Sequence, residues 1–344
     1  MATTTTTPVY TDLAAEYRAI TEGVGLHDSS YTGRLKAIGE DALDLINRLS
    51  TNGIVNLAPG QGAPTILTTD RGRILDLLGV VNTGDYVLLI TSPGCQQAVI
   101  DWLDKYTIME DLAVEDISGA TAAFTLCGPA SAAALAGVMA PQVEAGDLEA
   151  MGPYAALEGA IAGYEALATR RPLGDLVAFD VVVDAGSAAQ VWDALAEAGA
   201  TPVGLDAFNA ALVQNAVPRY GREMSDAYNP LEAGLIGSVD FAKGCYIGQE
   251  VIARLDTYRK VQRYLVRLRF SEDAVVSEGT GLEVDGLRVG QVTSLAALPS
   301  TGELAGLGYV RTARANPGER LNLVAPASGT AEIVDLPQLF GPGE

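Results

Sequence analysis

The spacing of apolar residues predicts mixed helices and strands over the first two thirds of the chain. Apolar positions three and four apart predict helices at 11–21, 40–49, 96–106, 130–139, 187–198 and 205–213. Short apolar runs bounded by turn residues predict strands at 34–38, 64–68, 74–81, 86–91, 112–117, 122–126, 164–168 and 176–183. The Thr83-Gly84-Asp85 stretch suits a hairpin, and residues 140–163, rich in Ala, Gly and Pro, predict a loosely ordered connection.

After residue 260 the helical spacing disappears. Short strands punctuated by Gly and Pro are predicted at 264–270, 282–284, 287–293, 304–309 and 320–324, which is typical of a small barrel or sandwich. Because helices and strands come in groups without regular βαβ alternation, the pattern favours an α+β fold over a doubly wound one. No Gly-x-Gly-x-x-Gly follows a strand, so no Rossmann fingerprint is present. A length of 344 residues suggests two or three domains.

The charge and hydrophobicity of the chain limit the kinds of partner that it can bind. The net charge of −21, from 43 acidic and 22 basic residues, disfavours binding to nucleic acid or to an anionic membrane. The chain contains no run of about 18 apolar residues, so no membrane-spanning helix is predicted. Six bases, Arg254, Arg259, Lys260, Arg263, Arg267 and Arg269, nevertheless fall close together. They predict either an anion-binding patch or a solvated strand face.

Cysteine and histidine usage excludes several kinds of site. Cys95, Cys127 and Cys245 are far apart and odd in number, so a zinc knuckle or a resident iron–sulfur cluster is not expected, and a reducing, cytoplasmic compartment fits. His27 is the only histidine, which excludes histidine-based triads and metal sites. The Thr-rich start, residues 1–7, lacks the features of a signal peptide and is expected to be a frayed tail.

The segment Lys243-Gly244-Cys245-Tyr246-Ile247-Gly248-Gln249-Glu250 carries the most distinctive chemistry. Glycines four apart indicate a tight turn or a close backbone approach. A lysine nearby lowers the pKa of a thiol, which makes Cys245 a candidate reactive group. The alternative is a buried small side chain in a turn, which is how most free cysteines are used.

This segment resembles the signature of the YgfZ-type folate-binding proteins, relatives of the glycine cleavage T-protein (aminomethyltransferase). Flanking segments agree: Pro218-Arg219-Tyr220-Gly221 and Asn229–Leu235 lie upstream, and Val251-Ile252-Ala253-Arg254 lies downstream. Weaker similarity covers nearly the whole chain, including Gly25–Ser30, Cys127-Gly128-Pro129 and Gly290–Ser294.

The resemblance implies two interleaved α+β lobes around a central cavity, formed by residues 8–262, and a C-terminal β-barrel domain formed by residues 263–344. It also implies a tetrahydrofolate-type cofactor, and a role in the assembly or repair of iron–sulfur clusters in partner enzymes. The residues expected to bind the cofactor are Asp76, Gln214, Lys243, Tyr246 and Arg254, and those expected to be catalytic are Cys245 and Asp76.

Departures from the T-protein pattern bear on the activity. An aspartate pair in T-protein corresponds here to Asp76-Leu77, so one acid is retained. The glutamate that grips the pterin corresponds to Gln214, which hydrogen-bonds without charge. The Tyr-Thr-Gly-Glu element is replaced by Pro172-Leu173-Gly174-Asp175. An acid such as Asp76 on a partly apolar strand is either a proton acceptor with a raised pKa or an ordinary strand residue.

Three functions therefore remain open. The first is a YgfZ-like accessory protein in which Cys245 is a transient ligand or thiol partner, Lys243 favours its thiolate, and Gln249 and Glu250 hold the loop. The second is a tetrahydrofolate-dependent aminomethyltransferase or demethylase. The third is a binding relative that kept the fold and lost folate.

Overall fold

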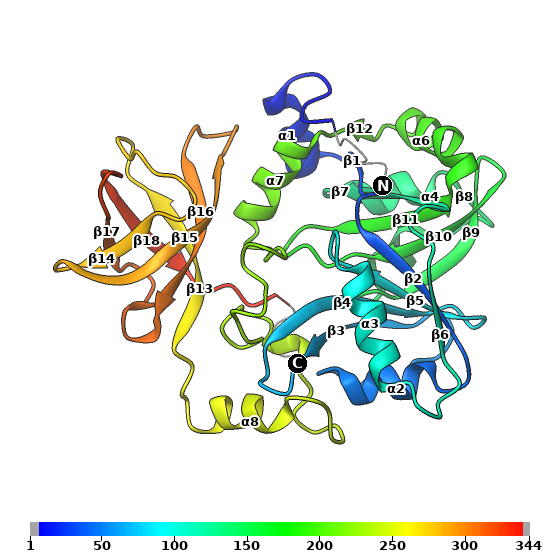
Figure 1. The fold of residues 1–344 in the computed structure, drawn as a ribbon. Coiled ribbons are helices and arrows are strands. Elements are labelled where there is room, and N and C mark those ends of the chain that lie inside the picture. The colour runs from blue at the N-terminus through cyan, green and yellow to red at the C-terminus, as the bar shows by residue number, and fades with distance from the viewer. Residues whose placement is uncertain (1–6, 340–344) are drawn as a thin grey trace.

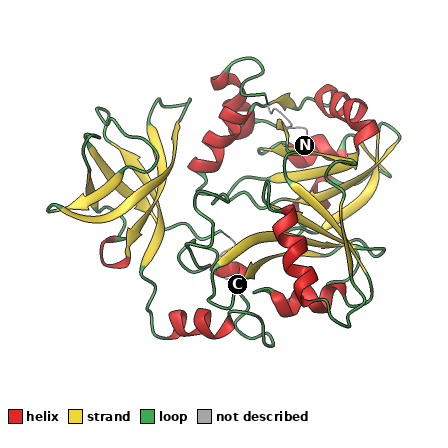
Figure 2. Ribbon diagram, in the orientation of Figure 1, coloured by secondary structure: helices red, strands yellow, loops and turns green. Residues whose placement is uncertain are grey.

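The computed structural model describes residues 7–339, and the Thr-rich start up to residue 6 lies outside that range. The chain forms two α+β lobes, each built on one sheet, and a separate closed barrel (Figure 1). Helices cover the outer faces of the lobe sheets, whereas the barrel consists mostly of strands (Figure 2). The predicted α+β class with a C-terminal barrel is confirmed.

The first lobe contains a seven-stranded sheet in the order β12-β1-β7-β11-β10-β9-β8. Its strands are β1 (Gly25–Asp28), β7 (Thr121–Cys127), β8 (Met139–Ala140), β9 (Ala156–Ile161), β10 (Tyr164–Arg170), β11 (Ala178–Asp184) and β12 (Thr201–Pro202). Its core joins Phe124 and Val181 of the sheet to apolar residues of the helices, such as Leu135 and Val191. These helices are α4 (Ser131–Ala136), α5 (Ala145–Glu149) and α6 (Ala188–Glu197).

The second lobe is formed entirely between β1 and β7, which makes the two lobes interleaved. Its five-stranded sheet has the order β3-β4-β5-β2-β6. The strands are β2 (Gly33–Ile38), β3 (Gly62–Thr68), β4 (Ile74–Asn82), β5 (Val87–Thr91) and β6 (Ala113–Asp116). Helices α2 (Ala42–Leu49) and α3 (Gln96–Tyr106) pack on it, and residues 83–86 form the predicted hairpin loop.

The barrel closes in the order β13-β16-β15-β14-β17-β18. Its strands are β13 (Arg263–Phe270), β14 (Gly281–Val284), β15 (Leu287–Ala297), β16 (Leu304–Arg311), β17 (Arg320–Leu323) and β18 (Thr330–Asp335). Closure removes the exposed strand edges that an open sheet would present. Helices α1 (Leu13–Glu22) and α7 (Leu205–Gln214) contact each other, and α7 lies between the lobes and the barrel (Figure 1).

The predicted loose connection at 140–163 is wrong. It contains α5 and β9, and β9 forms a hairpin with β10 in which Ile161 is paired with Tyr164. Both turn residues, Ala162 and Gly163, have positive φ, at 52° and 85°. Two-residue hairpins of this kind usually contain Asn-Gly or Asp-Gly, so an Ala-Gly turn gives little signal. Strands β1 and β18 and helix α8 (Gln249–Thr257) were also not predicted.

Candidate functional site

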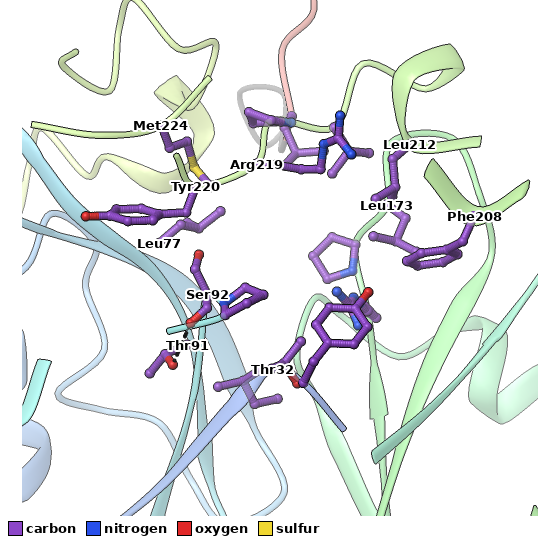
Figure 3. Close-up of a pocket in the computed structure, with 18 of the residues that line it drawn as sticks. Thr32, Leu77, Thr91, Ser92, Leu173, Phe208, Leu212, Arg219, Tyr220 and Met224 are labelled. Atoms are coloured by element: carbon purple, nitrogen blue, oxygen red, sulfur yellow. Dashed lines mark hydrogen bonds between the residues drawn. The ribbon is translucent and has the colours of Figure 1, made fainter. Parts of the chain in front are cut away.

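A cavity of about 250 Å³ lies where the two lobes meet. Figure 3 shows Leu77, Ser92, Tyr220 and Met224 on one side of it, and Leu173, Phe208 and Leu212 on the other. The first group comes from β4, the residue after β5 and the segment after α7, and the second from the segment after β10 and from α7. The walls are therefore largely apolar, as is usual for a small-molecule site.

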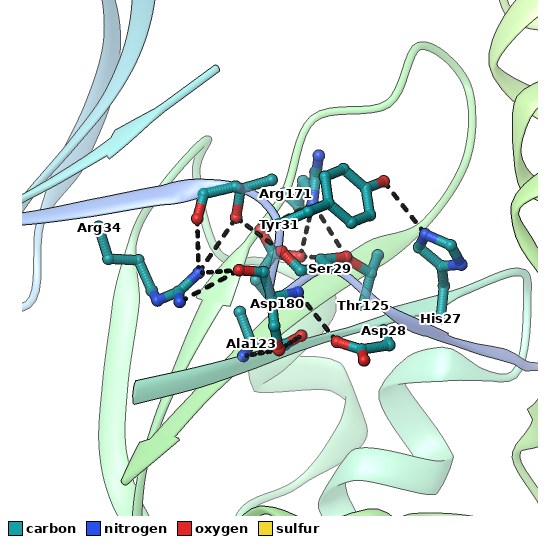
Figure 4. A network of polar contacts seen from close by, with 11 residues as sticks. His27, Asp28, Ser29, Tyr31, Arg34, Ala123, Thr125, Arg171 and Asp180 are labelled. Atoms are coloured by element: carbon teal, nitrogen blue, oxygen red, sulfur yellow. Dashed lines mark hydrogen bonds and ion pairs between the residues drawn. The ribbon is translucent and has the colours of Figure 1, made fainter. Parts of the chain in front are cut away.

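Two charged residues of the first lobe line the cavity as an ion pair. Nη1 of Arg171 lies 3.0 Å from Oδ1 of Asp180, and both side chains are mostly buried. The Thr125 hydroxyl donates to the same oxygen at 2.6 Å, and Ser29 hydrogen-bonds to Thr125 (Figure 4). The attraction of the guanidinium and the hydrogen bond from Thr125 offset the desolvation cost of burying the Asp180 carboxylate, so the pair presents polar groups to the cavity.

His27 belongs to the same network and is held as a neutral structural residue. Its ring stacks on Phe208 at 4.1 Å between centroids, and its nitrogens contact the Val203 carbonyl oxygen at 2.9 Å and the Tyr31 hydroxyl at 3.1 Å. Burial lowers the pKa of His27 to about 4. Burial also raises the pKa of Tyr31, which lines the cavity, to about 12.

Arg219 connects the cavity to the barrel. Nη1 donates to Oδ1 of Asn209, another lining residue, at 2.6 Å, and Nη2 donates to Oγ of Ser294 in β15 at 2.9 Å. The buried Nε–H has no partner among the described residues. A buried donor without a partner is costly, so a ligand acceptor at this point would be stabilised.

Asp76 lies directly behind the cavity wall and does not line it. Its carboxylate is fully buried and accepts hydrogen bonds from the backbone N–H groups of Ser92, at 3.0 Å, and Leu77, at 2.9 Å. Burial raises the pKa of Asp76 to about 7, although these hydrogen bonds oppose the shift. The adjacent Leu77 faces the cavity, so β4 contributes a hydrocarbon side chain to this wall.

Gln214 lies away from the cavity. It is the last residue of α7 and borders a smaller hollow with barrel residues such as Arg269 and Leu298. Its carbonyl oxygen accepts a hydrogen bond from Nη1 of Arg267 at 2.8 Å.

Sequence reasoning missed Arg171, Asp180 and Asn209, because no local pattern marks them. The Pro-Arg-Tyr-Gly stretch did contain Arg219.

Lys243 ties the signature segment to the end of α2. Nζ donates to the carbonyl oxygens of Asn47, Ser50 and Asn52 at 2.7, 2.9 and 2.6 Å. All three ammonium hydrogens are thus used, and none remains to donate a hydrogen bond to the Cys245 sulfur. Burial lowers the pKa of Lys243 to about 8.

Tyr246 and Cys245 differ in exposure. Tyr246 is 7% exposed and packs in a small core with Leu231, Val239 and Ile252, and burial raises its pKa to about 12. Cys245 is an exposed free cysteine, whereas Cys95 and Cys127 are buried. The Cys245 side chain is not among those lining the cavity.

Most of the arginine run is neutralised by carboxylates. Arg254 pairs with Glu250 on the exposed surface of α8 at 2.7 Å, so Glu250 contacts its own helix and not the loop before it. Arg267 pairs with Asp335, Arg269 with Glu332, and Arg263 with Glu232.

Within residues 7–339 no helix is long and apolar enough to cross a membrane.

Comparisons with known proteins agree with this architecture. Residues 5–243 match the family described as GCVT N-terminal domain, and residues 263–338 match the glycine cleavage T-protein C-terminal barrel domain. The chain is 31% identical over 320 residues to "Putative transferase At1g60990, chloroplastic" of Arabidopsis thaliana, covering 92% of this chain and 72% of that protein. It is 29% identical over 336 residues to an aminomethyltransferase of Halothermothrix orenii, covering 95% and 92%.

The fold is also that of a solved T-protein. The structure of glycine cleavage system aminomethyltransferase T from Bartonella henselae matches with a TM-score of 0.81 at 20% identity, over 97% of this chain and 92% of that one. The matches of both domains and the shared architecture point to the same family. The chain belongs to the glycine cleavage T-protein family.

Proposed function

We propose that this protein is a folate-binding accessory protein of YgfZ type that supports the assembly or repair of iron–sulfur clusters in partner enzymes. The observation that carries the proposal is Leu77, a hydrocarbon side chain at the position of the second acid in the T-protein pair. A ligand in the cavity meets no carboxylate on this strand, because Asp76 is turned into the lobe. Without a carboxylate from β4, this wall can bind a ligand but cannot take a proton from it, which favours a binding role over a catalytic one.

The cavity residues fit a folate-like cofactor. A pterin is flat and carries several donors and acceptors, so it needs apolar walls and a few directed polar groups. Phe208, Leu77 and Leu212 provide such walls, and the unpartnered Nε–H of Arg219 provides a donor. Asp180, held in an ion pair by Arg171, provides an acceptor. These residues would bind and orient the ring and exclude water from it.

Cys245 is the group proposed to act on clusters. It is exposed on the segment before α8, where a partner protein could reach it. No group of three His, Cys, Asp or Glu residues suited to a metal occurs in the described part of the chain. A single thiol therefore acts as a transient ligand to a cluster whose other ligands come from the partner enzyme. Lys243 and Tyr246 would hold the segment in place, and the compartment would be the reducing cytoplasm.

The test separates the thiol from the folate site. In cells that lack the wild-type gene, Cys245→Ser is expected to lower the activity of iron–sulfur enzymes severalfold, as the gene deletion does, while the purified variant binds tetrahydrofolate normally. Cys127→Ala, which removes a buried thiol, is the control and should restore activity. Full activity with Cys245→Ser would refute the thiol role, and an absence of tetrahydrofolate binding by the wild-type protein would refute the cofactor.

The alternative is a tetrahydrofolate-dependent aminomethyltransferase or demethylase. Asp180 favours it, because this carboxylate reaches the cavity from the other lobe. Formation of methylene-tetrahydrofolate by the purified protein, lost in Asp180→Asn, would support this alternative over the accessory role. Asp175→Asn changes an exposed acid of the same lobe and serves as its control.

A further inference from the structure

A second hollow, of about 420 Å³, lies on the wall of the barrel. Its charged and polar lining consists of Arg263 on β13, Arg288 and Gln291 on β15, and Arg311 on β16, together with the rings of Tyr228 and Tyr309. No carboxylate is among its lining residues, and it shares none of them with the cavity between the lobes. We call it the arginine hollow. Three guanidinium groups gathered here stand out in a chain with 43 acids and 22 bases.

The barrel register brings two of these charges together. Arg263 of β13 is directly opposite Arg311 of β16, and Gln291 of β15 is opposite Tyr309 on the other side of β16. Directly opposed residues of neighbouring strands point to the same face, and like charges in such a pair destabilise the sheet. An anion bound at this face would therefore lie close to both guanidinium groups.

Only one of the three arginines is neutralised by the protein. Arg263 lies 3.4 Å from the Glu232 carboxylate and donates to the Ala227 carbonyl oxygen at 2.6 Å. Arg288 and Arg311 are exposed and form no ion pair within residues 7–339. Arg288 instead donates to Oε1 of Gln291 at 3.1 Å, which directs its side chain along the hollow. Glu283 of β14 is directly opposite Arg288 but forms no ion pair with it, so neither Arg288 nor Arg311 is neutralised by a direct contact.

A rigid aromatic floor holds the hollow open. The rings of Tyr228 and Tyr309 stack at 3.9 Å between centroids, and the Arg263 guanidinium lies 4.5 Å from the Tyr228 centroid. The Tyr309 hydroxyl donates to the Glu223 carbonyl oxygen at 2.6 Å. Because these side chains are already fixed, the floor loses little conformational entropy when a ligand binds, and the entropic cost of binding comes from ordering Arg288 and Arg311.

We propose that the arginine hollow binds a small oligoanion, a ligand with at least two carboxylate or phosphate groups. Two unpaired guanidinium groups call for at least two negative charges, and guanidinium binds both carboxylate and phosphate with two parallel hydrogen bonds. The site is separate from the cavity assigned to folate, so it does not depend on the proposed function.

Isothermal titration of the full-length protein at low salt tests this site with two probes, inorganic pyrophosphate and γ-linked triglutamate. The Arg288→Gln/Arg311→Gln double variant is expected to bind at least tenfold more weakly than the wild type. The control is Arg314→Gln/Arg320→Gln, which removes the same charge from exposed positions of the barrel region outside the hollow. It should bind within twofold of the wild type. Tighter binding of pyrophosphate would identify phosphate as the natural group, and tighter binding of triglutamate would identify carboxylate.

Two outcomes would overturn the proposal: binding of neither probe by the wild type, or an equal loss of affinity in the control. The altered side chains are exposed, so both variants should fold, and circular dichroism checks this. Should the double Gln variant fail to fold, Arg288→Lys/Arg311→Lys keeps the charge but not the paired hydrogen bonds. It should bind severalfold more weakly, and unchanged affinity would count against the site.

Discussion

At the scale of single residues, Asp76 and Leu77 are neighbours on β4, but one points into the lobe interior and the other into the cavity. Strand geometry turns successive side chains to opposite faces, so Asp76 and Leu77 cannot both reach the same ligand. Asp76 is fully buried and Leu77 lines the cavity. The retained acid is therefore a part of the lobe interior, where desolvation dominates its chemistry.

Asp76→Asn tests this burial through the pH dependence of stability. Burial raises the folded-state pKa of Asp76 from 3.8 to about 7, so the folded state holds the proton more tightly than the unfolded state. Its contribution to stability is then fully present below about pH 4 and is lost as pH rises to about 7, by at most about 4 kcal/mol. Urea unfolding at pH 5 and pH 7.5 should show the larger part of this loss in the wild type and a smaller loss in the variant.

The control for this experiment is Asp85→Asn, which changes an exposed acid in the β4–β5 loop. It should retain the pH dependence of the wild type. Equal pH dependence in wild type and Asp76→Asn would mean that the carboxyl is not desolvated as the structure indicates.

At the scale of elements, the signature segment contacts two parts of the second lobe and then leads into α8. Lys243 binds carbonyl groups around the end of α2, and the Thr68 hydroxyl of β3 donates to the Ile247 carbonyl oxygen at 2.6 Å. Gly248 then starts α8 with φ at 86°. The two glycines predicted to permit a tight approach have different roles, since an added Cβ at Gly244 would meet nothing within 4 Å.

Gly248→Ala should destabilise the protein by about 2–3 kcal/mol. Alanine is strained at positive φ, and its Cβ would lie 2.5 Å from the Thr69 carbonyl oxygen. The measurement is the free energy of unfolding in urea. Gly244→Ala is the matched control, expected to stay within about 0.5 kcal/mol of the wild type. Similar effects of the two substitutions would contradict the close approach at Gly248.

At the scale of the whole molecule, buried Glu223 joins the lobes to the barrel. Its carboxylate accepts hydrogen bonds from the Ser294 hydroxyl of β15 at 2.5 Å and from the Arg219 backbone N–H at 3.1 Å. We propose that residues 8–262 and 263–344 are separate folding units and that this contact is a main connection between them. Charge-assisted hydrogen bonds of this kind stabilise a protein by about 1.5–3 kcal/mol.

Glu223→Gln should therefore weaken the coupling of the two units. Differential scanning calorimetry is expected to show a lower and broader transition that separates into two, with faster amide hydrogen exchange in β15 and β16 and unchanged exchange in β3 and β4. Glu319→Gln, which removes a carboxylate paired with Arg314 outside this contact, is the control. A single sharp transition shifted as a whole would show one cooperative unit instead.

The sequence predicted most helices and strands with strong apolar periodicity, and it predicted the barrel from its short strands. It did not predict β1 (Gly25–Asp28), because this strand is defined by pairing with β7 and β12, which lie about 100 and 175 residues further along the chain. Helix α8 was missed because it is largely exposed and buries only Ile252. The interleaving of the lobes was expected from family resemblance and not from periodicity.

The amino-acid sequence by itself determined the α+β class, the C-terminal barrel, the strongly acidic surface and the signature around Cys245, because these depend on composition and on local patterns. Only the tertiary structure decided which side chains meet. It turned Asp76 away from the cavity, placed Gln214 beside the barrel, and gathered Arg171, Asp180 and Arg219 around one ligand-sized space. The physical reason is that a cavity wall is assembled from side chains far apart in sequence. The local spacing of residues does not indicate which distant segments meet in space.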